Sequence, residues 1–263
     1  MRRLAALLLL LALAAPPARA SGPELDGPAL DWEARRRWVH VDNIATGNVP
    51  AFEAARRDWL RTLRVAGGGI PLYDGRPLFW SAERGPVRTY ITLHPFDRYG
   101  DLDARAERVR ATNAAVGEAA VRDYDKGDAF LVPPHYSQVW SREPAYDHVP
   151  AAGALTEATA RAGRLEVRQE QLQLDGDGYA AWKRLSQALA AANYPLTCRA
   201  FRSSLGTGQV ILLWLAADEA ALRAALPPAQ AAGPALAGEV DRLMPASESY
   251  AVVRRDELSN LGR

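Results

Sequence analysis

Residues 37–44 read RWVHVDNI, and this stretch sets the pattern for the rest of the chain. Apolar and polar side chains alternate along it, which is typical of a β-strand whose two faces meet different surroundings. A helix signal follows, because Asn48 can cap a helix, Pro50 suits a first turn, and Phe52 and Trp59 lie two helical turns apart. The sequence therefore predicts a strand followed directly by an amphipathic helix.

The remainder of the first half predicts two more strands, a second helix and a closing strand. The two strands span residues 78–82 and 87–94, on either side of a turn that contains Gly and Pro. The helix begins at Asp101 and carries an apolar stripe that also includes Asn113. Residues 135–140 form the last strand, so the first half has the order β-α-β-β-α-β.

The second half repeats this order at a spacing of roughly 120 residues, as a duplicated small domain does. Its predicted strands are residues 165–172, 196–202, 209–215 and 249–254. Its first helix is predicted to begin at Asp175 or Asp177, and its second at Asp218. β-α-β-β-α-β is the ferredoxin-like split βαβ unit, in which both helices cover one face of an antiparallel sheet. We therefore predict an α+β fold, in which two ferredoxin-like units pack sheet to sheet as a pseudo-dimeric α+β barrel.

The chain divides into six predicted segments. Residues 1–20 carry Arg2 and Arg3, a short apolar run and a small-x-small cleavage site, which predicts a signal peptide. The run is shorter than the about 20 residues of a transmembrane helix, so we expect no membrane span after cleavage and a periplasmic or secreted protein. The other segments are an N-terminal extension at 21–35, unit 1 at 36–141, a linker at 142–163, unit 2 at 164–258 and a tail at 259–263.

Composition disfavours several classes of function. The formal net charge of +1 does not favour a dedicated nucleic-acid binder. Cys198 is the single cysteine, so the chain cannot form an internal disulfide or a thiolate-rich zinc site, and we expect this residue to be buried. No phosphate-binding loop, dinucleotide-binding glycine motif or serine-hydrolase motif is present. We expect a small-molecule partner, bound by a monomer that acts as a pseudo-dimer.

The segment YITLHPF at residues 90–96 and the helix start DLDAR at residues 101–105 look like those of the NIPSNAP proteins. Over about residues 36–258 the chain resembles the dimeric α+β barrel superfamily, which also includes antibiotic-biosynthesis monooxygenases, haem-degrading monooxygenases and chlorite dismutases. This resemblance implies the fold and leaves the function open, because the members differ in chemistry. Haem-degrading members use an Asn, a Trp and a His in that chain order. Asn43, Trp80 and His94 occur in that order here, at separations that depart from the family's. The residues themselves indicate no cofactor, whereas the resemblance implies haem as a candidate.

We expect the ligand site to face the barrel interior, because the more apolar face of each strand should meet the helices. On this argument Val39 and Val41 pack on helices. The residues of unit 1 expected to point into the barrel are Trp38, His40, Asp42, Arg88, Tyr90 and His94, joined by Tyr136, Gln138 and Trp140 or by the opposite set of that strand. From unit 2, Glu166, Arg168 and Glu170 should point inward. Such a wall is either a paired ionic network or a ligand cavity, and the sequence leaves both interpretations open.

The aromatic and basic character of this wall favours an exported protein that binds a small aromatic or anionic molecule. Two alternatives stay open. One is a haem-linked or cofactor-free monooxygenase, centred on His94 or His40, that acts on a small aromatic or quinol-like substrate. The other is a structural or protein-interaction module that uses the helix bearing Asn113. We predict no metal site, because His40, Asp42 and His94 are suitable ligand types without a recognised spacing motif. No catalytic residue is assigned.

Overall fold

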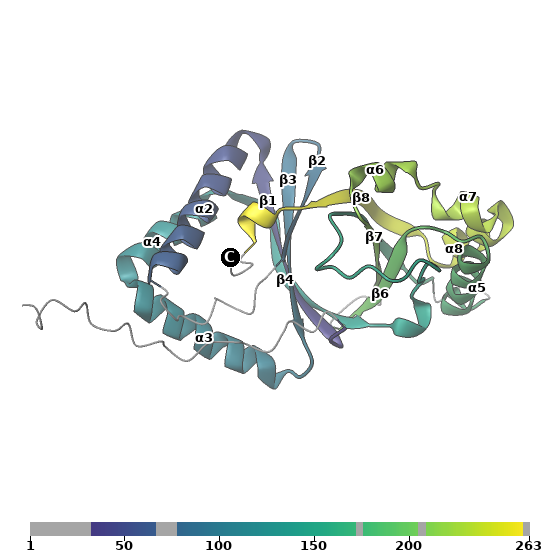
Figure 1. Ribbon diagram of the computed structural model, residues 1–263, viewed down its shortest axis with the longest axis horizontal. Helices are drawn as coiled ribbons and strands as arrows, with labels where there is room; N and C mark the ends of the chain where they lie inside the picture. The colour runs from purple at the N-terminus through teal and green to yellow at the C-terminus, as the bar shows by residue number, and fades with distance from the viewer. Residues whose placement is uncertain (1–32, 67–77, 172–175, 205–208, 260–263) are drawn as a thin grey trace, which may run out of the picture.

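The computed structural model describes residues 33–66, 78–171, 176–204 and 209–259, and within them the chain forms a closed antiparallel barrel with helices outside it (Figure 1). The predicted signal peptide, residues 1–20, and most of the predicted extension lie outside the described residues. The strands are β1 (Arg36–Ala45), β2 (Leu78–Arg84), β3 (Val87–Phe96), β4 (Leu131–Arg142), β5 (Ala162–Gln169), β6 (Thr197–Ser203), β7 (Gln209–Ala216) and β8 (Ala246–Arg254).

Each unit contributes four neighbouring strands to the barrel in the same relative order. Around the barrel the order is β1-β3-β2-β8-β5-β7-β6-β4, so unit 1 supplies β4-β1-β3-β2 and unit 2 supplies β8-β5-β7-β6. The two sheets join where Trp80 of β2 faces Arg254 of β8, and where Trp140 of β4 faces Ser203 of β6. The predicted fold, two ferredoxin-like units closed into one α+β barrel, is confirmed.

The helices lie on two opposite sides of the barrel, one set for each unit (Figure 1). Helices of unit 1 are α2 (Val49–Ala66), α3 (Gly100–Val116) and α4 (Glu118–Asp125); those of unit 2 are α5 (Gly178–Ala191), α6 (Glu219–Ala224), α7 (Pro228–Ala232) and α8 (Pro234–Leu243). The helix expected from Asp101 is broken at Gly117, whose φ of 87° favours glycine. Asn113 on α3 is half-buried and lies outside the barrel core. No helix among the described residues is long and apolar enough to cross a membrane.

The barrel interior is filled by apolar side chains from both units. Val39 and Ile91 of unit 1 belong to one buried cluster with Phe201 and Leu213 of unit 2, and the Trp80 side chain in the same cluster is 1% exposed. The inner faces of the two sheets cover each other, so their apolar side chains are removed from water. This burial is the main stabilising contribution expected of such a core. The barrel interior is therefore the hydrophobic core that joins the two units.

This packing corrects the predicted direction of the strand faces. Val39 and Val41, expected against the helices, point into the barrel. The expected inward residues Trp38, His40, Asp42, Arg88, Tyr90 and His94 lie on the opposite face of the sheet, toward the helices of unit 1. The prediction failed because the most apolar face of each sheet meets the other sheet, while the helices cover a mixed polar and aromatic face.

The same correction applies to unit 2. Glu166 accepts a hydrogen bond of 3.3 Å from Nε1 of Trp214, which packs in the helix-side cluster, and Arg168 pairs with Asp241 of α8 at 2.9 Å. Glu166 and Arg168, two of the three residues predicted to point inward from unit 2, therefore face helices. Cys198 is 0% exposed in that helix-side cluster, as predicted, and burial raises the pKa of its thiol.

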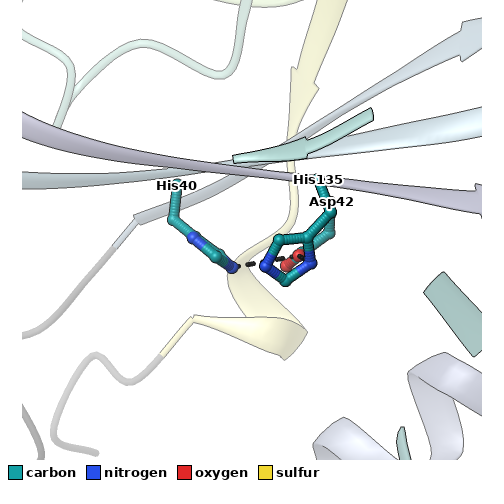
Figure 2. Close-up of side chains that lie close together, drawn as sticks. All are labelled: His40, Asp42 and His135. Atoms are coloured by element: carbon teal, nitrogen blue, oxygen red, sulfur yellow. Dashed lines mark ion pairs between the residues drawn. The ribbon is translucent and has the colours of Figure 1, made fainter. Parts of the chain in front are cut away.

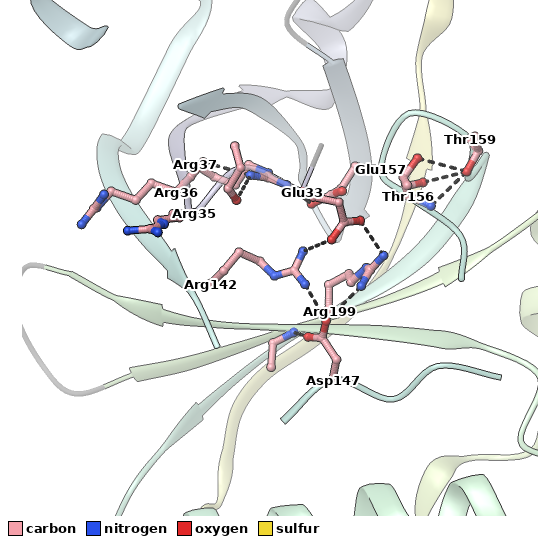
Figure 3. Close-up of polar contacts among 12 residues, drawn as sticks. Glu33, Arg35, Arg36, Arg37, Arg142, Asp147, Thr156, Glu157, Thr159 and Arg199 are labelled. Atoms are coloured by element: carbon pink, nitrogen blue, oxygen red, sulfur yellow. Dashed lines mark hydrogen bonds and ion pairs between the residues drawn. The ribbon is translucent and has the colours of Figure 1, made fainter. Parts of the chain in front are cut away.

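Buried ion pairs at one end of the barrel connect the linker to both units (Figure 3). Arg37 of β1 pairs with Glu157 of the linker at 3.1 Å, and both side chains are 0% exposed. Asp147, also in the linker, pairs with Arg142 of β4 at 2.6 Å and with Arg199 of β6 at 3.0 Å. Removal of one partner would leave a buried unpaired charge, so this cluster fixes the path of the linker between the units.

Candidate functional site

A pocket of about 250 Å³ lies between the sheet of unit 1 and the helices α2, α3 and α4. Its lining combines aromatic rings, two histidines, two arginines and two carboxylates. The lining residues are Trp38, His40, Asp42, Phe52, Ala55, Arg56, Phe79, Thr92, His94, Arg105, Tyr124, Gly127, Asp128 and Leu131. A concave site with apolar walls and a few convergent polar groups is the usual form of a small-molecule site.

Strands β1 and β3 form the floor of this pocket. Trp38 lies directly opposite His94 in the antiparallel pairing, and His40 lies opposite Thr92, so all four side chains share one face of the sheet. The Trp38 ring lies 4.8 Å from the His94 ring and stacks on His40 at 5.5 Å, measured between ring centroids. The pocket floor is therefore an aromatic surface with an imidazole on each side of the indole.

Two arginines from the helices cover the aromatic floor. The guanidinium carbon of Arg105, on α3, lies 4.1 Å from the centre of the Trp38 ring, and that of Arg56, on α2, lies 4.3 Å from the centre of the Phe79 ring. Arg56 also donates to the Tyr124 hydroxyl at 3.1 Å and to the carbonyl oxygen of Leu258 at 3.3 Å. Hydrogen bonds hold Arg56 in place, and Arg105 brings a positive charge onto the indole at the pocket wall.

Two lining residues, His40 and Asp42, converge with His135 of β4, which lies just outside the lining (Figure 2). Oδ1 of Asp42 lies 3.0 Å from Nε2 of His40 and 3.4 Å from Nδ1 of His135, yet it makes no hydrogen bond of normal geometry with the described residues. The other ring nitrogen of His40, Nδ1, lies 2.8 Å from Oγ of Ser137, which fixes the orientation of that ring. We refer to His40, Asp42 and His135 as the histidine–aspartate cluster.

The carboxylate of Asp128 adds negative potential to the same wall. Burial raises the pKa of Asp128, and the nearby carboxylates of Asp125 and Asp42 raise it further, although His135 and His40 oppose this effect. An acid with a raised pKa next to two imidazoles favours a cation or a proton at this side of the pocket.

Two of the six predicted site residues lie outside the pocket lining. The Tyr90 hydroxyl donates to Oε1 of Glu53 at 2.6 Å, and Arg88 pairs with the same oxygen at 3.0 Å. Arg255, close to the C-terminus, reaches that oxygen at 2.8 Å. Arg88 and Tyr90 therefore belong to a paired ionic network beneath α2, whereas Trp38, His40, Asp42 and His94 line the pocket.

Several residues in and beside the pocket were not predicted from the sequence. His135 and Ser137 belong to the opposite set of the closing strand, which the sequence left open, because Ser137 lies directly across from His40. A shift of register between Val41 and Asn43 follows, close to the point where His135 approaches Asp42. Arg105 was visible only as part of a family-like helix start, and nothing in the sequence aimed it at Trp38.

Comparisons with known proteins identify the fold. No protein-family model matches the chain, and no curated protein matches it. Among solved structures, a candidate monooxygenase from Fusobacterium nucleatum is 7% identical over 84% of this chain and 92% of that chain, with a TM-score of 0.53. A heme-binding protein from Thermus thermophilus is 9% identical over 85% and 92%, with a TM-score of 0.47, and a mutant chlorite dismutase from Candidatus Nitrospira defluvii is 10% identical over 86% and 94%, with a TM-score of 0.48. At 7% identity the likeness to the Fusobacterium nucleatum protein shows a shared fold and no activity.

Proposed function

We propose that the protein binds a small aromatic molecule with an anionic group in the pocket of unit 1. The observation that carries this proposal is the position of Arg105 over the Trp38 indole, because this pair offers an apolar surface and a positive charge side by side. Phe52 and Phe79 extend the apolar surface. A volume of about 250 Å³ suits a compound with one ring, since it lies just below the about 300–1,000 Å³ of sites for drug-sized ligands.

A thermal-shift screen tests this proposal directly. Benzoate and salicylate should raise the melting temperature at millimolar concentration, and the uncharged analogue benzyl alcohol should raise it less, because it lacks the group that Arg105 recognises. Binding stabilises the folded state in proportion to the logarithm of ligand concentration over its dissociation constant. The shift should therefore grow with concentration.

Two variants of α3 decide whether the pocket is responsible. Arg105→Gln should remove most of the response to benzoate, whereas Arg108→Gln, an exposed residue of the same helix that does not line the pocket, should keep it. Equal responses in both variants would refute the assignment of the site, even if the protein binds these compounds elsewhere.

A second candidate function, cofactor-free monooxygenation of a quinol-like substrate, is favoured by one feature of the pocket. His94 and His40 flank the Trp38 ring, so either imidazole could accept a proton from a phenol stacked on the indole. Oxygen consumption with quinols that is lost in His94→Ala would support this function. An absence of oxygen consumption by the wild-type protein would remove it and leave binding.

Haem, the cofactor that the fold resemblance implies, does not fit this pocket. A volume of about 250 Å³ accommodates a single-ring compound, and a haem is larger than that. A bound haem would also need an axial ligand that faces a space large enough for the whole macrocycle. We therefore assign no step to haem. When haemin is mixed with the protein, the absorption spectrum of haemin should stay unchanged. A Soret shift that disappears in His94→Ala would show that the pocket does bind haem.

We further propose that the protein is exported to the periplasm or secreted after cleavage behind Ala20, and that it acts as a monomer. The tandem arrangement of the units supports the monomer, because one chain closes the barrel. A NIPSNAP-like ancestry and an origin by duplication stay proposals as well. The intact mass of protein recovered from the producing cell tests the cleavage, and its sedimentation tests the monomer.

A further inference from the structure

The histidine–aspartate cluster has the composition of a metal site. Two neutral imidazole nitrogens and one carboxylate oxygen are the donor set of many open sites for divalent transition metal ions. The three donor atoms come from two adjacent strands, β1 and β4, and all lie within 4.8 Å of one another. We propose that His40, Asp42 and His135 bind one divalent first-row transition metal ion at the wall of the pocket.

The two donor separations measured from Asp42 match those around a single ion. Two ligands with bond lengths of about 2.1 Å lie about 3.0 Å apart at a right angle and about 3.4 Å apart at a tetrahedral angle. The measured separations from Oδ1 of Asp42 are 3.0 Å to His40 and 3.4 Å to His135. The two imidazoles stand almost perpendicular, at 83° and 4.7 Å between ring centroids, so they approach the carboxylate from different directions.

The directions of the polar groups favour an ion over a simple ion pair. If the cluster served only to pair charges, Oδ1 of Asp42 would be expected to accept a hydrogen bond from one of the imidazoles. It accepts none of normal geometry within the described part of the chain, although both nitrogens are near. Donor atoms that converge without hydrogen bonding to each other leave a common point that a cation can occupy.

The surroundings of His40 prepare it as a ligand. Ser137 holds Nδ1 of the ring at 2.8 Å, so Nε2 faces Asp42, and such outer partners fix the orientation of metal-binding histidines. His40 and Asp42 stand two residues apart on one strand, where a regular backbone holds both side chains on the same face. His135 is 40% exposed, so its ring can rotate the small distance needed to complete the set.

The site would be open toward the pocket. Among the residues that the structure describes, three protein groups converge there, and the exposed fractions of the side chains are 25% for His40 and 12% for Asp42. Three protein ligands leave positions for water or for an anionic ligand, whereas structural sites fill four positions with protein groups. A carboxylate or phenolate held by Arg105 in the same pocket would then have a second cationic partner.

Titration with Co²⁺ and Zn²⁺ tests this proposal without any organic ligand. The full chain, purified without a histidine tag and stripped with a chelator, should bind one Co²⁺ with visible d–d absorption, and one Zn²⁺ should displace it. Affinity should fall as the pH is lowered, because protons compete with the metal ion for the imidazole nitrogens. Absence of stoichiometric binding of both ions would overturn the proposal.

Matched variants locate the ion. His135→Ala and Asp42→Asn should abolish stoichiometric binding, and Ser137→Ala should weaken it by about 10-fold, at the lower end of the range for outer partners. His94→Ala is the control, because His94 lines the same pocket outside the cluster. Binding that survives His135→Ala would refute the assignment. Because His135 is partly exposed, His135→Ala should have the same melting temperature as the wild-type protein, which calorimetry checks.

The metal proposal and the proposed aromatic ligand fail independently. Arg105→Gln should leave Zn²⁺ affinity unchanged, since Arg105 lies on the Trp38 side of the pocket. If the wild-type protein binds Zn²⁺ but no aromatic carboxylate, the ligand is wrong and the metal site stands. If the wild-type protein binds benzoate but no metal ion, the metal site is wrong and the aromatic ligand stands.

Discussion

At the scale of single residues, Glu53 shows how the helix layer of unit 1 is held to its sheet. Its carboxylate lies on α2 and contacts Tyr90 and Arg88 of β3 and Arg255 near the C-terminus. Burial alone would raise the pKa of Glu53, but these hydrogen bonds and positive charges outweigh it and lower that pKa. The folded state therefore prefers the ionised form more strongly than the unfolded state does.

We expect Glu53→Gln to reduce the free energy of unfolding at pH 7 by about 1.5–3 kcal/mol, the range for hydrogen bonds that involve charged groups. Because the folded-state pKa is below the unfolded value, this stabilisation is present above the unfolded pKa and is lost as pH falls through the folded pKa. Urea unfolding from pH 7 to pH 3 should show the two proteins converging in acid. A constant difference across that range would contradict this explanation.

At the scale of elements, local sequence signals located the strands and helices well. Asp177, one of the two predicted caps, begins α5 by accepting hydrogen bonds from the backbone amides of Tyr179 and Ala180. The prolines at 227 and 228 interrupt the helix that starts after Asp218, and the chain resumes as α7 and α8. These signals act within a few residues, so they can be recognised without knowledge of the tertiary fold.

The break between α3 and α4 was not predicted, because a single glycine within an apolar stripe does not reveal its backbone angles. Gly117 has φ 87° and ψ 153°, a region that other residues avoid. Beyond this bend, Val121 and Tyr124 of α4 pack against the α2 cluster of Trp59, Leu60 and Leu63. Tyr124 also lines the pocket, and the glycine therefore shapes the site from a distance.

Gly117→Ala should lower the stability of the protein by about 1–3 kcal/mol, the cost of placing a side chain in that region of backbone space. Apart from the adjoining residues, no atom in the described part of the chain lies within 4 Å of the added carbon, so the cost comes from the backbone and not from a clash. Gly100→Ala is the matched control, since Gly100 has equal space and an ordinary φ. Thermal unfolding should separate the two variants, and equal stability would show that the bend is not strained.

At the scale of the whole molecule, the alternation of side chains along each strand predicted which residues share a face. It did not predict whether that face meets the helices or the other sheet. Trp38, His40 and His94 were correctly grouped, and the direction of the group was reversed. In a two-layer domain the apolar face meets helices, whereas two units that close a barrel place their most apolar faces together. That choice depends on the second unit, more than a hundred residues away, and no local pattern records it.

This reversal has a functional consequence. The barrel interior is the common core of the two units, so it contributes to stability. The polar and aromatic residues that attracted attention in the sequence serve a pocket in unit 1, between sheet and helices. Over the matching face of unit 2, Trp182, Trp214 and Cys198 pack as an apolar cluster. The two units share a fold and differ in what their helices cover.

We propose that ligands bind in the pocket of unit 1 and not in the barrel interior, and a titration of pocket-filling variants decides between the two places. Ala55 of α2 lines the pocket, so Ala55→Trp should fill it, whereas Val65→Trp adds the same ring to the same helix at a position that is 87% exposed. Calorimetric titration with the most stabilising aromatic carboxylate should detect binding to the wild-type protein and to Val65→Trp, and no binding to Ala55→Trp. The melting temperature of Ala55→Trp should equal that of the wild-type protein, which shows that the variant is folded. Undiminished binding to a folded Ala55→Trp variant would contradict the claim.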